Sequence, residues 1–159
     1  MTQRGTTLAL TAVLTVLLAG CFGNEEEPEP TAEPTAAAEP SDFEELSGAE
    51  IPESAESVEV FSVGDSGSLR KYVATFTLSD EEEAKAFCES GKIGYYRVLS
   101  AGDVVEEERE RHFIGETELV DPVRCTSVKQ GENVDRSVVF SYPEGERVSV
   151  WALTQEVGW

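Results

Sequence analysis

The sequence of 159 residues has few basic side chains, one histidine, one methionine and no apolar run long enough to cross a bilayer. Twelve Lys and Arg stand against 32 Asp and Glu, so the formal charge is −20 at pH 7. Phosphate groups repel a chain this acidic, and the composition therefore disfavours nucleic acid as a partner. The single histidine, His112, follows Glu110 and Arg111. In such a charged stretch it is expected to be an exposed surface residue without a catalytic role.

The motifs that mark common catalytic and cofactor sites are also missing. The sequence has no P-loop, dinucleotide fingerprint, G-x-S-x-G, H-E-x-x-H or C-x-x-C pattern, so we expect no catalytic residues, no cofactor and no metal. Residues 64–68, GDSGS, fit a hairpin turn. One acidic cluster could gather a divalent cation, although Arg109 and Arg111 interleave with it and favour a solvated charged face. Its members are Glu106, Glu107, Glu108 and Glu110.

The N-terminus carries a short apolar segment that ends in a cysteine. Arg4 precedes twelve apolar or small residues, 8–19, a length that suits a signal peptide better than a span of about 20 residues. The segment closes with Leu18, Ala19, Gly20 and Cys21, which resembles the lipobox of bacterial lipoproteins. This resemblance implies a diacylglyceryl group on the Cys21 thiol and removal of residues 1–20. An ordinary secretory signal or an N-terminal anchor with a coincidental cysteine is the alternative.

The next residues differ sharply from the rest of the chain. The net charges of residues 1–20, 21–69 and 70–159 are +1, −14 and −7. Residues 21–42 are rich in Glu and Pro and can bury little surface, so they predict a disordered tether behind the lipid anchor. Residues 43–159 remain as a single domain, which is long enough for one hydrophobic core.

Within that domain the patterns predict hairpins and one main helix. Strands are expected at 57–63 and 70–78, because apolar residues alternate along the second. Ser79 and Glu82 form a capping box for a helix that ends near Gly91, which could supply a left-handed stop. Residues 94–113 are ambiguous between strand, loop and short helix. Three further strands are expected, at 123–129, 135–142 and 147–154. This order predicts an α+β fold, an antiparallel sheet with one main helix packed on a face.

Three cysteines are present, and the lipobox accounts for Cys21. Cys88 and Cys125 remain as a natural disulfide pair, which export would permit. Closing a loop of about 38 residues would contribute about 4 kcal/mol on the chain-entropy model. Two buried free thiols are the alternative, and a metal site made of two cysteines and His112 is a more distant one.

Aromatic residues near the C-terminus offer one candidate surface. Trp151 is expected in the last strand, and Phe140 and Tyr142 share one face of the strand before it. An uncovered sheet face there would form an apolar binding surface, whereas a covered one would place these residues in the core.

The complete layout resembles small cell-surface lipoproteins of actinobacteria: a lipobox, a Glu/Pro-rich tether and a small disulfide-linked domain. The resemblance implies attachment to the extracytoplasmic face of the cell membrane through lipid on Cys21. We therefore expect a non-enzymatic interaction domain whose partner is an envelope protein or a small ligand. A binder of small ligands or divalent cations and a hydrolase are the alternatives.

Overall fold

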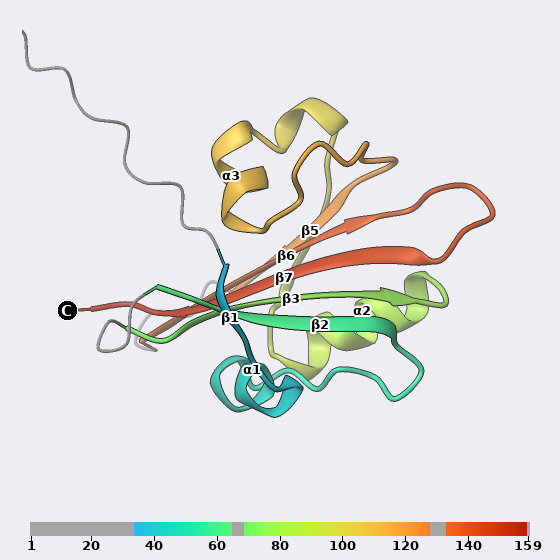
Figure 1. The fold of residues 1–159 in the computed structure, drawn as a ribbon. Helices are drawn as coiled ribbons and strands as arrows, with labels where there is room; N and C mark the ends of the chain where they lie inside the picture. Colours follow the sequence, from blue (N-terminus) through green and yellow to red (C-terminus); the bar gives the residue numbers. More distant parts are fainter. Residues whose placement is uncertain (1–33, 65–68, 128–132, 159) are drawn as a thin grey trace, which may run out of the picture.

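The computed structural model describes residues 34–64, 69–127 and 133–158. They form an α+β fold around one antiparallel sheet of seven strands (Figure 1). The strands are β1 (Pro34–Ala37), β2 (Glu56–Val63), β3 (Lys71–Leu78), β4 (Tyr95–Val98), β5 (Val123–Thr126), β6 (Val134–Ser141) and β7 (Val148–Glu156). Their spatial order is β1-β2-β3-β7-β6-β5-β4. β7 therefore lies between two groups of strands that come from the two halves of the domain.

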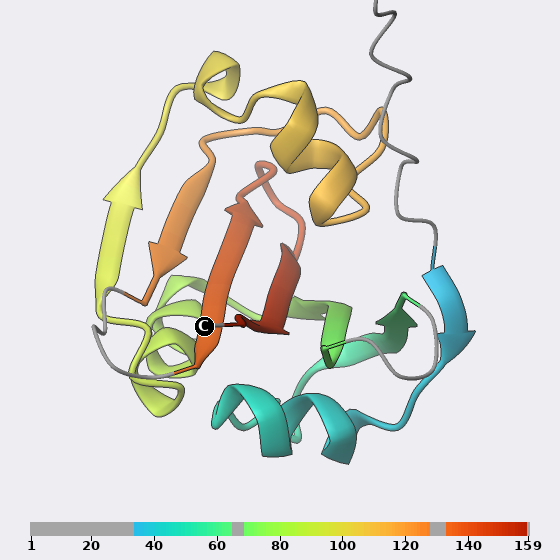
Figure 2. The same cartoon turned by 90° about the vertical axis from the view of Figure 1, so that its left-hand side faces the viewer.

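Helices lie on both sides of this sheet. The described helices are α1 (Pro40–Ser47), α2 (Glu81–Ser90), the 3-10 helix η1 (Ala101–Asp103) and α3 (Glu106–Arg111). Figure 2 shows α1 and α2 together on one side and α3 on the other. We call the first side the helical face. The second is the cap face, after the cap segment of residues 99–122 that contains η1 and α3.

The expected order of hairpins and helix is confirmed. β2 pairs with β3, and β6 pairs with β7, each antiparallel. The helix begins one residue later than the capping box predicts, because Asp80 is its N-cap and accepts a hydrogen bond from the Glu83 backbone N–H at 3.0 Å. The expected left-handed stop at Gly91 is wrong: its φ is −76°, and Lys92 adopts the positive φ instead. A Cβ on Gly91 would lie 2.8 Å from the Cβ of Ala49, so close packing explains the glycine.

Two elements at the start of the domain differ from expectation. β1 pairs with β2, with Ala37 opposite Phe61, and α1 begins at Pro40. Regular structure is therefore present from Pro34 on, nine residues before the boundary expected at residue 43. Phe43 and Leu46 bury the inner side of α1, and Gly48 ends the helix with a φ of 67°. The Nε–H of Arg136 on β6 donates a hydrogen bond to the Ser47 carbonyl, which fastens this helix to the sheet.

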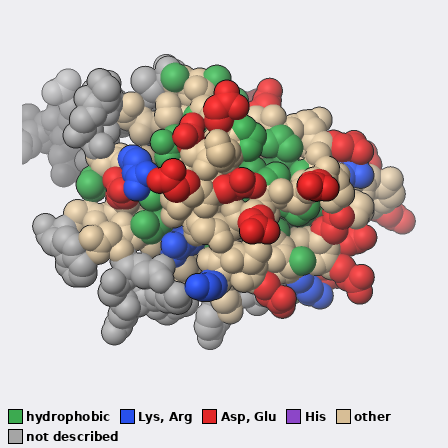
Figure 3. All heavy atoms as spheres, turned by 90° about the horizontal axis from the view of Figure 1, so that it is seen from below, with side chains coloured by type: hydrophobic (Ala, Val, Ile, Leu, Met, Phe, Trp, Pro, Cys, Tyr) green, Lys and Arg blue, Asp and Glu red, His purple; other side chains and the backbone are tan. Residues whose placement is uncertain are grey.

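The helical face holds one continuous core. Even-numbered residues of β7, Val148 to Ala152, pack with Phe76, Phe87 and Phe140 in a single cluster of buried side chains. The rings of Phe76 and Phe87 meet edge to face, with centroids 5.2 Å apart. From outside, acidic side chains spread over this face and hydrophobic ones show between them (Figure 3). The outer sides of α1 and α2 thus keep an acidic surface over an apolar core.

The cap face is divided into smaller pieces. Leu99, Val104, Ile114 and Leu119 of the cap segment pack on Val139 and Trp151. A separate cluster joins Val63, Val73 and Leu153, with Phe113 against it. The cap segment therefore covers β6 and part of β7, and Phe113 reaches toward β3.

Candidate functional site

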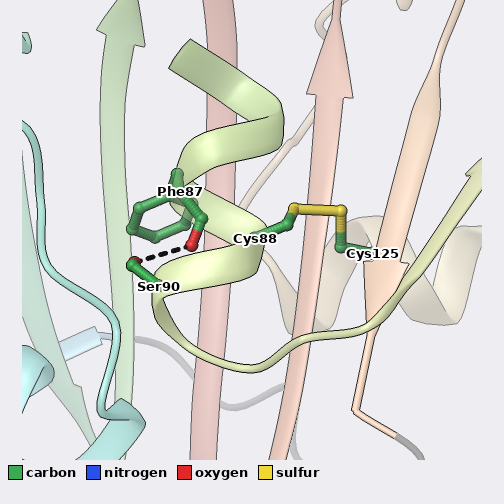
Figure 4. The surroundings of a disulfide bond; sticks show 4 residues. All are labelled: Phe87, Cys88, Ser90 and Cys125. Carbon is green, nitrogen blue, oxygen red and sulfur yellow. Dashed lines mark hydrogen bonds between the residues drawn. A yellow bond between two sulfur atoms is a disulfide. The ribbon is translucent and has the colours of Figure 1, made fainter. Parts of the chain in front are cut away.

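The disulfide predicted between Cys88 and Cys125 is confirmed. Cys88 of α2 and Cys125 of β5 are bonded, with their Cα atoms 6.3 Å apart (Figure 4). Both half-cystines are buried. Next to them, the Ser90 hydroxyl donates to the Phe87 carbonyl at 2.8 Å and accepts from the Glu50 N–H at 3.2 Å. The bond therefore joins the helix to the sheet inside the core of the helical face.

The lipobox residues Leu18, Ala19, Gly20 and Cys21 lie outside the described residues, as does most of the turn expected at residues 64–68. Among the described residues, no helix is long and apolar enough to pass through a membrane.

The acidic cluster of α3 divides into one structural residue and three solvated ones. Glu106, Glu107 and Glu110 are exposed. Glu108 instead turns toward the sheet and forms an ion pair with Arg124 of β5. Burial raises the pKa of the Glu108 carboxyl, and the Arg124 guanidinium opposes that shift. Within the described ranges, no three Asp, Glu, His or Cys side chains are grouped to hold a metal ion.

His112 differs most from expectation, because it is buried rather than exposed, with 1 % of its surface accessible. It follows the last residue of α3. Its Nδ1 lies 2.9 Å from the Glu108 carbonyl oxygen, and its Nε2 lies 3.3 Å from the Ser137 carbonyl oxygen. Burial lowers the pKa of the imidazole to about 4. A neutral ring has one N–H and can donate to only one of these two carbonyls, so His112 links cap to sheet as an uncharged side chain.

The aromatic surface suggested by the sequence is not one surface. Trp151 pairs with Val139, whereas Phe140 pairs with Val150. Because side chains alternate along a strand, Trp151 lies on the cap face and Phe140 on the helical face with Tyr142. Phe140 is fully buried, Tyr142 is half-buried, and Trp151 has 8 % of its surface accessible. The three residues belong to the cores of two different faces.

A hollow of about 220 Å³ lies on the cap face over β2, β3 and β7. Sequence reasoning did not find it. The residues that line it are Ser57, Glu59, Thr75, Phe76, Thr77, Ser149, Val150 and Trp151. Glu59, Thr75 and Trp151 form one row across the three strands, and Thr77 and Ser149 form the next. Small side chains in the middle and larger ones at the sides leave the sheet surface open.

The backbone beside the hollow is irregular. The pairing of β2 with β3 shifts between Glu56 and Glu59, which marks a β-bulge. Ser57 within it has a φ of 54°. A positive φ is uncommon for a residue with a Cβ, and bulges of this kind re-aim the side chains that follow. In the sequence, Thr75 and Thr77 mark small polar positions on one face of β3, but they do not locate the hollow.

No protein-family model, curated protein or solved structure matches this chain.

Proposed function

We propose that this protein is an exported lipoprotein whose folded domain, residues 34–159, is held at the extracytoplasmic face of the cell membrane by acyl chains on Cys21. The observation that carries this proposal is the buried disulfide between Cys88 and Cys125. Disulfides form and persist mainly in oxidising compartments outside the cytosol. The bond also accounts for two of the three cysteines. It leaves Cys21, which closes the lipobox-like segment Leu18–Cys21, as the cysteine that would carry the lipid.

Because strand β1 already begins at Pro34, the proposed connection to the membrane is shorter than the tether expected at residues 21–42. Residues 21–33 separate the proposed lipid from β1, and they include five glutamates and two prolines. Thirteen residues span roughly 20 Å as a flexible coil and roughly 40 Å in a polyproline II conformation. The domain would thus sit close above the headgroups. Acyl chains supply the strong hydrophobic attachment that an acidic domain needs near an anionic surface.

The proposed role of the domain is binding rather than catalysis. Its partner is an envelope protein or a small ligand, reached from a membrane-tethered position. Reproducible substrate turnover that a single substitution abolishes would overturn this part of the proposal. The Glu106–Glu110 cluster is a poor cation site, because Glu108 forms an ion pair with Arg124.

The test of the anchor compares cysteine variants of the full chain in bacteria grown with an alkyne-labelled fatty acid. We expect label on the wild-type chain, recovery in the membrane fraction, and an intact mass that lacks residues 1–20 and gains a lipid. Cys21→Ala should lose the label and keep residues 1–20. The double variant Cys88→Ala/Cys125→Ala is the matched control and should keep the label. A wild-type chain without label, or label that survives Cys21→Ala, would refute the anchor.

A further inference from the structure

We propose that the hollow on the cap face is a binding site for a compact organic cation, a primary ammonium group on a short apolar stem. The site consists of the Glu59 carboxylate, the hydroxyls of Thr75 and Ser149, and the Trp151 indole as one wall. It lies in the folded domain, so it does not depend on the lipid anchor.

The charge of the hollow comes from one carboxylate. Two other charged groups lie at its far end, but they compensate one another: the Arg147 guanidinium pairs with Glu56 at 3.4 Å. The Nε–H of Arg147 also donates to the Thr77 hydroxyl at 3.2 Å. Glu59 has no hydrogen-bond or ion-pair partner among the described residues and is exposed. One uncompensated negative charge therefore faces the hollow, which is complementary to a monovalent cation.

The hydroxyls beside this charge are also available. Thr77 is engaged, since its hydroxyl accepts from Arg147 and donates to the Glu56 carbonyl at 3.4 Å. Thr75 and Ser149 make no side-chain hydrogen bond within the described part of the chain. An ammonium group offers three donors and no acceptor. The Glu59 carboxylate and the Thr75 hydroxyl, which lie opposite one another in the register, supply acceptors for it, and Ser149 adds a further hydroxyl two strands from Glu59 in the next row. A divalent metal instead prefers six or more oxygen ligands with several carboxylates.

The walls of the hollow suit a short apolar stem. The floor is the sheet itself, because Phe76 and Val150 turn their side chains to the opposite core. Trp151 stands on one side, held against the cap segment by Leu99 and Ile114. A volume of about 220 Å³ accommodates a ligand of a few heavy atoms. The net charge of −20 adds a long-range attraction for cations that salt will weaken.

The test is a titration of the ¹⁵N-labelled full chain with n-butylammonium chloride, followed by NMR at constant ionic strength. We expect saturable shifts centred on the backbone amides of Thr75, Ser149 and Trp151 and on the Trp151 indole N–H. The dissociation constant should be about 1 to 10 mM, as befits a small ligand in an open site. Higher salt should raise it.

Matched variants separate the site from the general acidity of the surface. Glu59→Gln should weaken binding about fivefold, the effect of an exposed ion pair. Glu50→Gln removes the same charge on the opposite side of the sheet and should leave the constant unchanged. Thr75→Val, which alters no charge, should weaken binding about twofold. The proposal is overturned if no saturable shift occurs, if shifts spread over the acidic helices, if Glu59→Gln and Glu50→Gln act alike, or if neutral methyl glucoside binds equally well.

Discussion

The two faces of the sheet use the same strands and are built differently. On the helical face, seventeen buried residues form one cluster that α1 and α2 close. On the cap face, the buried residues divide into clusters of six and three. Polar groups occupy the space between and beside those clusters: the His112 ring, the Glu108–Arg124 pair and the hydroxyls of the hollow. One continuous apolar core therefore holds one face, whereas smaller apolar clusters and directed polar contacts together hold the other.

This difference separates stability from surface chemistry. A continuous apolar core contributes in proportion to the area it buries, and it offers little to a ligand. Each hydrogen bond or ion pair on the cap face adds only a modest net stability, but it fixes geometry and responds to pH and to charge. Variants on the helical face should thus change the free energy of unfolding at every pH. Variants on the cap face should have smaller or conditional effects.

The largest effect is expected in the aromatic centre of the helical face. Phe87→Ala removes a fully buried ring that meets Phe76 edge to face. The lost burial and the cavity should together lower the free energy of unfolding by about 3 to 5 kcal/mol. Chemical denaturation followed by circular dichroism measures it. Glu89→Ala, exposed on the same helix, should stay within about 0.5 kcal/mol. A small loss for Phe87→Ala would mean that α2 is not packed as described.

The disulfide should have the next largest effect. Replacing both Cys88 and Cys125 by Ala frees a chain segment with a sequence separation of 37 residues. The chain-entropy model places the loss at about 4 kcal/mol, and strain in the native state reduces the measured value to about 2 to 4 kcal/mol. Thermal unfolding of the oxidised, reduced and double-variant chains provides the measurement. Equal melting temperatures of all three would show that the bond does not constrain the unfolded chain.

Comparison of particular residues shows how far the sequence predicts this molecule. Alternation along residues 71–78 predicts β3 correctly, since period-2 burial needs only local information. The cysteine pair follows from counting. β1 was missed because Pro34–Ala37 repeats the Pro, Thr and Ala of the acidic segment before it and shows no strand pattern of its own, so that it becomes a strand only by pairing with β2. For α1, the signals were present: Pro40 at its start, Phe43 and Leu46 one turn apart, and Gly48 at its end.

The cap face was harder to predict, because its contacts join distant parts of the chain. Whether Trp151 and Phe140 share a face depends on the register of β6 against β7, and a one-residue change in register reverses the answer. His112 directly follows charged residues in sequence, yet its partners include the Ser137 carbonyl on β6. The hollow depends on which strands the cap segment leaves open. No local pattern contains that information.

His112 should make stability depend on pH in a defined window. Its pKa is about 4 in the folded protein and near 6.5 when unfolded. Between these values the unfolded chain binds a proton that the folded chain does not, so the free energy of unfolding falls as pH falls from about 6.5 to about 4. Across this window the free energy of unfolding falls by about 3 kcal/mol in total, and the full contribution of His112 is present above pH 6.5.

Denaturation curves at several pH values, compared with His112→Gln, isolate this contribution from that of the carboxylates. The difference in unfolding free energy between the two proteins should change steadily between about pH 6.5 and pH 4 and be constant above that window. His112→Gln keeps an uncharged donor for one carbonyl. Any free energy of unfolding that this variant loses at neutral pH is the same across the window, so it leaves the pH dependence of the difference unchanged. Parallel curves across the window would show that His112 titrates normally and is not buried against Ser137.

The smallest expected effect distinguishes two glutamates of α3. Glu108→Gln leaves the half-buried Arg124 guanidinium without its charged partner and should lower the free energy of unfolding by about 1 to 2 kcal/mol, between the values for exposed and buried pairs. Glu106→Gln makes the same chemical change at an exposed position and should stay within about 0.5 kcal/mol. Thermal melts of both variants at low and high salt check the prediction, since salt screens a partly buried pair only weakly. If the two variants melted alike, Glu108 would be one more solvated acid, and the cap face would lose the ion pair that joins α3 to β5.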